Sequence, residues 1–347
     1  MKAIAKTAPA PGLEYIDVPE PTPGPGEVKI RVRAAAICGA DIHFQRWDRL
    51  AENLRAKYAM EFPAVIGHEC AGDVVETGTG VKGIRAGDRI AVETHIPCGR
   101  CYQCQNGMRH NCADMGLYSY SCAGCFAEYA LVPERVCYHL AENVSYEEGA
   151  LFEPGGVAMR AIEESLLQPG DAVLVYGCGP IGLMAIQMLN ACGAATVIGV
   201  DIDDYRLAMA ERFGCVPVNA ARGDVRGIVR EVTGARGGVD ALLEMTGAAG
   251  VYGTVFDVIR IEGRLVTVGH PLEPVSVNVT NMVNMKGLLW KGIFGRRIWE
   301  TWWKVSSLVA AGKIRLADVI THRFCCDEYE EAFAQIDKGA GKILFLP

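Results

Sequence analysis

Long apolar segments are missing from this chain of 347 residues. No apolar run reaches the ~20 residues that a helix needs to cross a bilayer, and the first residues lack the ~7–15-residue apolar core of a signal peptide. An excess of positive charge is missing too, because the net charge is -7, whereas binders of nucleic acid or anionic membranes are usually basic. We therefore expect a cytoplasmic protein with neither a nucleic-acid nor a membrane partner.

The sequence also lacks internal repeats and low-complexity tracts, and its hydrophobic (50%) and charged (22%) fractions are those of an ordinary globular protein. Its length favours two domains over one core. Cysteine, in contrast, is abundant, with 14 residues. In so long a chain they do not form a disulfide scaffold, and in a reducing compartment they are thiols or metal ligands.

The pattern of strands and helices changes along the chain. Residues 1–154 contain short β-branched runs separated by Gly and Pro, which predicts an irregular, barrel-like β domain. Residues 155–293 alternate short buried strands with helical segments, which predicts a parallel, doubly wound α/β sheet with 287–293 as its sixth strand. Residues 294–347 contain two amphipathic helices and a closing strand, and we expect them to complete the first domain.

A glycine motif between a strand and a helix predicts a dinucleotide site. In "VLVYGCGPIGLMAIQML", Gly177 permits a tight turn, Gly179 lets a pyrophosphate approach the backbone, and Gly182 allows close strand–helix packing. Asp201 follows Gly182 by 19 positions, at the end of the next strand. A carboxylate there binds ribose hydroxyls and repels a 2′-phosphate, so we predict NAD rather than NADP. Arg206 leaves three alternatives open: it contacts a phosphate, stacks on adenine or pairs with Asp201.

Four cysteines within 15 residues predict a closed metal site. They lie in "PCGRCYQCQNGMRHNC", and their spacing suits tetrahedral zinc: Cys98, Cys101, Cys104 and Cys112. An iron–sulfur cluster also uses clustered cysteines, but no other electron-transfer signal accompanies them. Four thiolates leave no position for a substrate, so we expect this zinc to be structural. The nearby pair Cys122 and Cys125 has no further partners in sequence, and we assign it no metal.

A second group of ligand-type residues is scattered along the chain. Cys38, His68, Glu69 and Glu153 offer a thiolate, an imidazole and two carboxylates. An open zinc site needs three protein ligands and one free position. The spacing alone does not bring these four residues together.

In order and spacing, these motifs resemble the zinc-dependent medium-chain alcohol dehydrogenase family over essentially the whole chain. Within that family, the closest likeness is to the L-threonine 3-dehydrogenase branch. The residues that carry the family resemblance are Cys38-Gly39 with His43, Gly67-His68-Glu69, the four cysteines, Glu153-Pro154, Gly177 to Gly182, and Asp201. The segments that carry the branch resemblance are "HIPCGRCYQC", "GCFAEYALVP", "DIDDYRLAMAERFG", "KGIFGRRIWETWWK" and "VITHRF".

The resemblance implies a fold and a reaction. The fold is a Rossmann domain (155–293) inserted in a GroES-like catalytic β domain (1–154, completed by 294–347). The reaction is hydride transfer to NAD from a secondary alcohol, L-threonine or a related amino alcohol; the alternative is a polyol, sugar or other hydroxy compound. It implies two Zn²⁺ ions, one catalytic and one structural, and a homo-oligomer, either a tetramer or a dimer. A zinc-binding interaction module and a catalytically inactive relative with a single zinc are the rival hypotheses.

The resemblance also implies roles for individual residues. Cys38, His68 and a carboxylate hold the catalytic zinc, and that carboxylate is Glu69 or Glu153. Glu153 coordinates directly or through water and supports proton transfer, while His43 relays the proton outward. His95 matches a histidine near the active site. The residues expected to contact NAD are Gly177, Gly179, Ile181, Gly182, Asp201, Arg206, Val268, Gly269, His270, Ile293 and Phe294.

The sequence departs from the family pattern at two places. Two residues after the zinc cysteine, the family usually has a Thr or Ser whose hydroxyl passes the proton, whereas this chain has Ala40. Cys38 and His68 also lie 30 positions apart, several more than expected for the threonine branch. The additional residues fall in "DRLAENLRAKYAMEF", a region expected to flank the substrate entrance.

Overall fold

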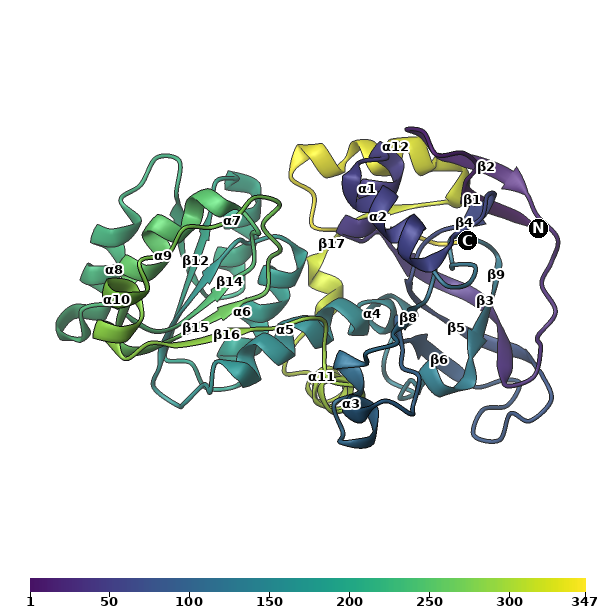
Figure 1. Cartoon of the computed structure of the whole chain (residues 1–347), viewed down its shortest axis with the longest axis horizontal. Coiled ribbons are helices and arrows are strands. Elements are labelled where there is room, and N and C mark those ends of the chain that lie inside the picture. Colours follow the sequence, from purple (N-terminus) through teal and green to yellow (C-terminus); the bar gives the residue numbers. More distant parts are fainter. The chain divides into compact units, whose positions relative to one another are not determined.

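The computed structural model describes the backbone of all 347 residues and every side chain except that of Asp337. The chain divides into two compact units (Figure 1). The first unit contains Met1–Pro154, Arg297–Ala310 and Leu316–Pro347, and the second contains Gly155–Arg296 and Ala311–Arg315. The division expected from sequence, with catalysis and NAD binding in separate domains, stays a prediction. No helix among the described residues is long and apolar enough to cross a membrane.

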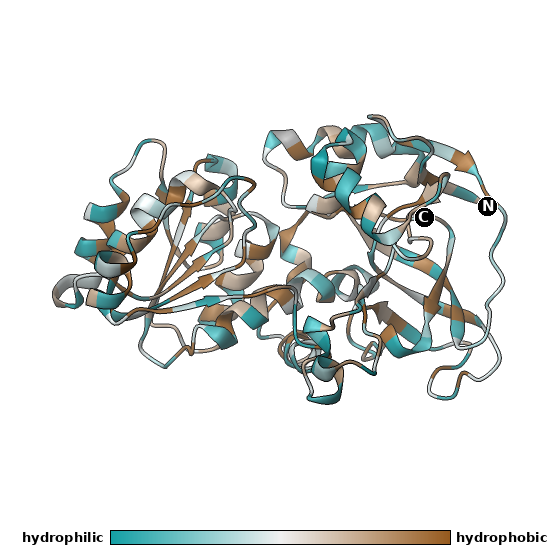
Figure 2. Cartoon of the chain, in the orientation of Figure 1, coloured by the Kyte–Doolittle hydropathy of each residue, from teal (hydrophilic) through white to brown (hydrophobic). Residues whose placement is uncertain are grey.

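The second unit is built on a six-stranded parallel sheet in the order β13-β12-β11-β14-β15-β16. Its strands are β11 (Ala172–Tyr176), β12 (Thr196–Asp201), β13 (Val216–Asn219), β14 (Val239–Glu244), β15 (Ile259–Thr267) and β16 (Leu289–Gly292). Every residue of β11 and β14 is buried, as expected for parallel strands covered on both faces, and apolar colouring follows the strands in Figure 2. The strand order reverses between β11 and β14, and the crevice outside such a reversal is where doubly wound sheets bind ligands.

Helices connect these strands. They are α5 (Phe152–Glu164), which begins in the first unit, α6 (Pro180–Ala191), α7 (Asp204–Arg212), α8 (Val225–Thr233), α9 (Tyr252–Val258) and α10 (Val279–Met282), with short 3₁₀ turns η3 (Gly234–Arg236), η4 (Ala249–Val251) and η5 (Asn284–Lys286). The prediction of a doubly wound α/β sheet is confirmed. The segment predicted as the sixth strand forms β16 at the sheet edge.

The first unit is mainly antiparallel β structure. Its strands are β1 (Lys2–Lys6), β2 (Glu14–Asp17), β3 (Glu27–Ala36), β4 (Ala64–Val65), β5 (Glu69–Thr77), β6 (Arg89–Val92), β7 (His95–Ile96), β8 (Gly116–Leu117), β9 (Tyr129–Pro133), β10 (Cys137–His139), β17 (Ile320–Phe324) and β18 (Lys342–Phe345). The largest sheet runs β10-β6-β5-β3-β18-β17, with β9 also paired to β3. Strand β18 pairs with β3, so the tail completes the sheet that the N-terminal residues begin.

Short helices surround this β structure. They are α1 (Gly39–Arg46), α2 (Arg49–Tyr58), α3 (Tyr102–Gln105), α4 (Tyr146–Ala150), α11 (Glu300–Ala310) and α12 (Tyr329–Ala334), with 3₁₀ turns η1 (Arg109–Asn111), η2 (Glu134–Val136), η6 (Leu316–Val319), η7 (Cys326–Glu328) and η8 (Ile336–Lys338). The core between the sheets is apolar and includes Ile4, Ile30, Val92, Phe126 and Phe345. Helix α2 lies within the longer segment that the sequence predicts to flank the substrate entrance.

Helix α11 is anchored by one buried tryptophan. Trp302 is fully buried, packs against the rings of Tyr138 and Phe152, and donates its indole N–H to Glu93 Oε2 at 2.6 Å. Trp303, the next residue, is 65% exposed. The aromatic residues of this segment therefore do not form one uniformly packed face.

We expect Trp302→Phe to lower the free energy of unfolding by about 1–3 kcal/mol, because it removes the indole donor and leaves a void. Differential scanning calorimetry would show this as a lower Tm. Trp303→Phe is the matched control and should stay within about 0.5 kcal/mol of the wild type. Equal losses in the two variants would contradict the anchoring role of Trp302.

Candidate active site

Strand register brings the scattered ligand-type residues together. In the β3–β5 pair, Ala36 lies opposite Glu69. Cys38, two residues after the end of β3, therefore lies beside the first residues of β5. The ligand atoms of Cys38, His68 and Glu69 all lie within 4.8 Å of one another. This thiol, imidazole and carboxylate are the donors that an open zinc site uses.

Local backbone geometry fixes each of these residues. Cys38 is the N-cap of α1 and its backbone N–H donates to Asp41 Oδ2 at 2.8 Å. Gly67, just before His68, has a φ of 91°, and a Cβ there would lie 2.3 Å from the Phe126 ring. Only glycine fits this turn, which directs the imidazole into the interior.

A buried lysine completes the cluster. Strand β18 runs antiparallel to β3 with Leu344 opposite Ala36, which places Lys342 beside the chain that leads to Cys38. The Lys342 ammonium donates to a Glu69 carboxylate oxygen and, at 3.0 Å, to the Ile37 carbonyl. Sequence reasoning missed Lys342, because nothing in the sequence pairs the last strand with the third. It missed Asp41 as well, although an acidic residue three positions after an N-cap is a capping signal.

The cluster has more acidic than basic groups. Among the main electrostatic neighbours of Cys38, Asp41 and Glu69, the bases are His68 and Lys342, and Glu153 adds a further acid. Burial raises the pKa of Glu69 to about 7, although Lys342 opposes that shift. Burial alone would lower the pKa of His68, but the charges of Cys38 and Asp41 outweigh it and raise the pKa to about 10.

The residues fit a divalent cation. Burying several acids with too few bases is costly, and a dication restores the balance. The buried His68 Nδ1 has no hydrogen-bond partner among the described residues, and Asp41 Oδ1 lies 3.8 Å from it. Glu153 is buried at the start of α5 and close enough to influence the pKa of His68 and Glu69, but it lies outside the 4.8 Å group. Its role as a ligand stays a prediction.

The other predicted residues of this site lie on neighbouring elements. His43, on α1, contacts Asp48 through Nδ1, with 2.5 Å between Nδ1 and Oδ2. Ala40, also on α1, packs against the apolar cluster of Phe44, Ala51, Met60 and Tyr120. The Tyr120 ring centroid lies 5.8 Å from that of His68.

His95 is buried in β7, and its backbone N–H donates to Glu93 Oε1 at 2.7 Å. Glu93 is the carboxylate that also accepts the Trp302 indole. Glu93 therefore links the backbone at His95 to helix α11 through hydrogen bonds. Its expected part in substrate handling stays a prediction.

The four cysteines form a second donor cluster in the first unit. The ligand atoms of Cys98, Cys101, Cys104 and Cys112 lie within 4.8 Å of one another. The Sγ atoms of Cys101 and Cys112 are 3.8 Å apart, and a tetrahedron with Zn–S bonds of about 2.3 Å places its sulfurs about 3.8 Å apart. Hydrogen bonds from the backbone N–H groups of Cys104 and Ala113 lower the pKa of Cys101 to about 6. The donor set therefore fits zinc.

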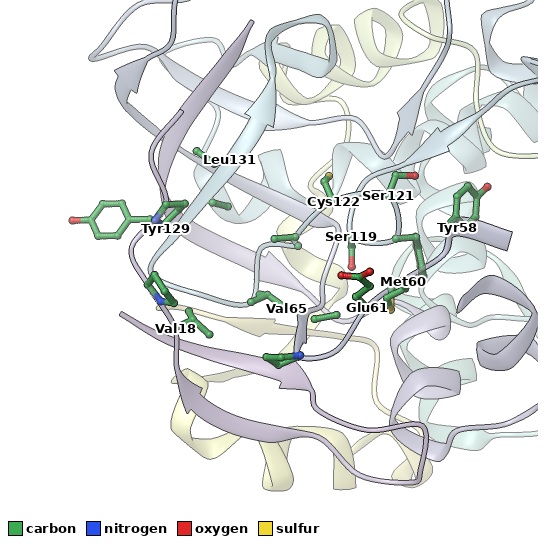
Figure 3. Close-up of a pocket in the computed structure, with 18 of the residues that line it drawn as sticks. Val18, Tyr58, Met60, Glu61, Val65, Ser119, Ser121, Cys122, Tyr129 and Leu131 are labelled. Carbon is green, nitrogen blue, oxygen red and sulfur yellow. The ribbon is translucent and has the colours of Figure 1, made fainter. Parts of the chain in front are cut away.

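Cys122 and Cys125 do not join either cluster. Cys122 lines a cavity of about 490 Å³ in the first unit, together with Met60, Glu61 and Val65 (Figure 3). None of the predicted metal ligands lines this cavity, but Met60 and Tyr120 of the apolar cluster beside His68 do.

The glycine motif of the second unit forms an open cradle at the start of α6. A Cβ on Gly182 would lie 1.9 Å from the Gly177 carbonyl oxygen, so close packing requires glycine there. A Cβ on Gly179, the N-cap of α6, would meet no protein atom within 4 Å. The space beside Gly179 and the positive end of α6 suit a pyrophosphate.

Asp201 ends β12 beside this cradle. Its Oδ2 accepts from the Cys178 N–H at 2.7 Å, and its Oδ1 accepts from the Ile202 and Asp203 N–H groups. Arg206 lies in the first turn of α7, and its Nε has no hydrogen-bond partner among the described residues. The role of Arg206 stays a prediction.

The remaining predicted NAD contacts follow β15 and β16. A Cβ on Gly269 would lie 2.1 Å from the Gly247 N, so the loops after β14 and β15 pack closely. The ring centroids of His270 and Phe294 are 6.1 Å apart. Ile293 is buried, whereas Phe294 is half exposed. Contacts of Ile181, Val268 and these residues with NAD stay predictions.

Comparison with known proteins decides the family. Residues 24–142 match the alcohol dehydrogenase GroES-like domain, and residues 180–311 match the zinc-binding dehydrogenase family. The chain is 37% identical to L-threonine 3-dehydrogenase of Cronobacter sakazakii over 347 residues, covering 99% of each chain. This chain belongs to the zinc-dependent medium-chain alcohol dehydrogenase family. The resemblance inferred from the motifs is confirmed, and so is the GroES-like and Rossmann architecture.

Solved structures agree with this assignment. The dehydrogenase has a TM-score of 0.88 to (2R,3R)-butanediol dehydrogenase from Bacillus subtilis, at 31% identity, with 100% of this chain and 99% of that chain covered. Its TM-score is 0.89 to an Escherichia coli alcohol dehydrogenase complexed with NADH, at 28% identity and the same coverage. The protein is therefore a zinc-binding oxidoreductase of the alcohol dehydrogenase type.

The two glycines of the dehydrogenase's cradle should respond differently to substitution. We expect Gly179→Ala to raise the Kd for NADH about tenfold or more with little change in Tm, because the new methyl fills only the cofactor space. Gly182→Ala should lower Tm, because its methyl meets backbone. Titration of protein fluorescence with NADH and calorimetry measure the two effects. Unchanged NADH binding in Gly179→Ala would contradict the cradle assignment.

Proposed function

We propose that this dehydrogenase oxidises the secondary hydroxyl of L-threonine, or of a closely related amino alcohol, with NAD as the hydride acceptor. The observation that carries the proposal is the buried Cys38–His68–Glu69 cluster, in a chain 37% identical over its full length to an L-threonine 3-dehydrogenase. The NADH-bound structural relative and the acidic residue at Asp201 support NAD as the cofactor.

The two donor clusters suit different roles. Cys98, Cys101, Cys104 and Cys112 fill a tetrahedron, so a zinc ion there is structural. Cys38, His68 and Glu69 leave a fourth position open, so a zinc ion there is catalytic, with Glu153 near it as a further ligand or a proton acceptor. Zinc at the open site supplies Lewis acidity that lowers the pKa of a substrate hydroxyl, and NAD supplies the hydride acceptor.

The chain's own residues hold and move the proton. Lys342 and Asp41 fix Glu69 and the backbone of Cys38, so the ligands keep one arrangement. His43 is the proposed outer member of the proton relay, since an imidazole titrates near neutral pH. Ala40 supplies no hydroxyl between the cluster and His43. The proton is therefore proposed to travel through water, through the cofactor ribose or by way of Glu153.

Substrate screening tests the proposed reaction. We expect L-threonine to give kcat/KM values at least about tenfold above those of butanediol and polyols, measured as NADH absorbance. Cys38→Ser, which removes a proposed ligand, should lose about 100-fold or more in kcat.

A clear preference for a diol or polyol would instead support the alternative function, which the likeness to (2R,3R)-butanediol dehydrogenase favours. The helix α2, near the expected substrate entrance, is the element most able to change that preference. No NADH formation with any of these alcohols would contradict both versions.

Metal analysis tests the two-site proposal. We expect two zinc ions per chain in the wild type and one in either Cys101→Ser or Cys38→Ser. Cys101→Ser should also lower Tm, because the four-cysteine loop loses its cross-link. Cys122→Ser is the control and should keep both ions. A single zinc in the wild type would support the catalytically inactive relative.

Two broader expectations go with this function. We propose a homo-oligomer, a tetramer or a dimer, and the exposed edge strand β16 supports it, because all four of its residues are exposed. We also propose a cytoplasmic location, which fits the 14 free thiols.

A further inference from the structure

His43 is held by one specific partner. Its Nδ1 lies 2.5 Å from Oδ2 of Asp48, and both side chains are partly exposed, at 33% and 41%. Burial alone would raise the pKa of Asp48, but hydrogen bonds from His43, Ala51 and Leu50 outweigh it and lower the pKa, so the carboxylate is ionised. An ionised carboxylate only accepts hydrogen bonds. The Nδ1 atom must therefore carry the proton, and the neutral ring presents Nε2 as its acceptor.

Asp48 is itself fixed from the other side. Its Oδ1 accepts from the backbone N–H groups of Leu50 at 2.9 Å and Ala51 at 3.3 Å, and so caps helix α2. Its own N–H donates to the His43 carbonyl at 3.4 Å. Oδ1 of Asp48 thus caps α2, and Oδ2 binds the imidazole of His43.

Helix α2 is anchored independently of Asp48. Ala51 is fully buried in the cluster with Phe44, Met60 and Tyr120, and Leu54 and Tyr58 pack on the same cluster. These three α2 residues share one helix face because their spacing is three and four. Because Ala51 holds the first turn of α2 in this cluster, the position of Asp48 at the N-cap depends on α2.

We propose that Asp48 is a positioning residue for the proton relay, which holds His43 in its Nδ1–H tautomer and is itself held by α2. The proposal rests on the proposed function, in which His43 relays the proton. In each turnover, Nε2 accepts the outgoing proton, the carboxylate stabilises the resulting imidazolium, and the same proton leaves from Nε2 to solvent. The Nδ1–H tautomer is then restored. Because Ala40 offers no hydroxyl, the orientation of His43 matters more in this chain.

Asp48→Asn separates the two tasks of the carboxylate. Asparagine is as good an N-cap as aspartate, so α2 keeps its cap. With its oxygen on α2, the amide presents an N–H group to Nδ1 and favours the opposite tautomer, as occurs when Asn replaces the aspartate of a catalytic triad. We expect kcat to fall about 10- to 100-fold with KM and Tm nearly unchanged.

Asn53→Gly is the matched control, because it weakens the exposed face of α2 without touching Asp48 or His43. It should lower stability by only a few tenths of a kcal/mol, because glycine is a slightly poorer helix former than asparagine, and it should keep kcat. Equal loss of kcat in Asn53→Gly and Asp48→Asn would show that Asp48 acts only through helix stability and would overturn the proposal.

A second measurement does not depend on turnover. In a ¹⁵N-histidine spectrum of the full chain, assigned by the signals lost in His43→Gln, the His43 Nδ1 should carry the proton in the wild type and lose it in Asp48→Asn. A wild-type Nε2–H tautomer would overturn the proposal even if the enzyme is active. The expected tautomers would support the positioning of His43 even if no tested alcohol is oxidised.

The double variant decides whether Asp48 acts through His43. If His43→Gln lowers kcat and adding Asp48→Asn lowers it no further, the two residues act as one unit, which supports the proposal. Additive losses would overturn it. Wild-type kcat in His43→Gln would remove the relay role and the proposal together, whereas wild-type kcat in Asp48→Asn alone would overturn only the proposal.

Discussion

The pairing of β3 with β5 on one side and β18 on the other is the constraint on which the candidate active site depends. The end of β3 meets the starts of β5 and β18, and these segments, far apart in sequence, deliver Cys38, His68 with Glu69, and Lys342. Side chains alternate across a strand, so a slip of one residue in either pairing would turn these groups to the opposite face. The cluster is therefore as specific as the register that builds it.

Burial changes the pKa values of the groups in that cluster. Four acidic groups and two basic groups lie together in the interior, and burial raises the pKa of Glu69 and Cys38. A divalent cation relieves this imbalance, whereas further hydrogen bonds relieve it only partly. In the four-cysteine loop, backbone N–H groups lower the pKa of Cys98 and Cys101, whereas burial raises the pKa of Cys104 and Cys112. The two sites thus differ in access as well as in ligands.

Helix α2 contacts two features of the candidate site. Its buried face completes the apolar cluster that also receives Ala40, and the ring of Tyr120 in that cluster lies against His68. Its N-cap reaches His43. The missing hydroxyl and the longer segment, which are separate departures in sequence, are thus neighbours in space. This proximity gives a physical reason to consider them together.

Short-range patterns in the sequence determined much of this protein. The glycine spacing and the alternation of strands and helices predicted the doubly wound sheet, and the four cysteines are close enough in sequence to predict their own cluster. The family resemblance linked Cys38, His68 and Glu69, which spacing alone did not. Tertiary structure alone decided the parts played by Lys342, Asp41 and Asp48 and the position of Glu153 outside the closest group. Local spacing fixes which neighbours a residue meets within one element, whereas contacts between distant strands depend on register and packing, which no short stretch of sequence contains.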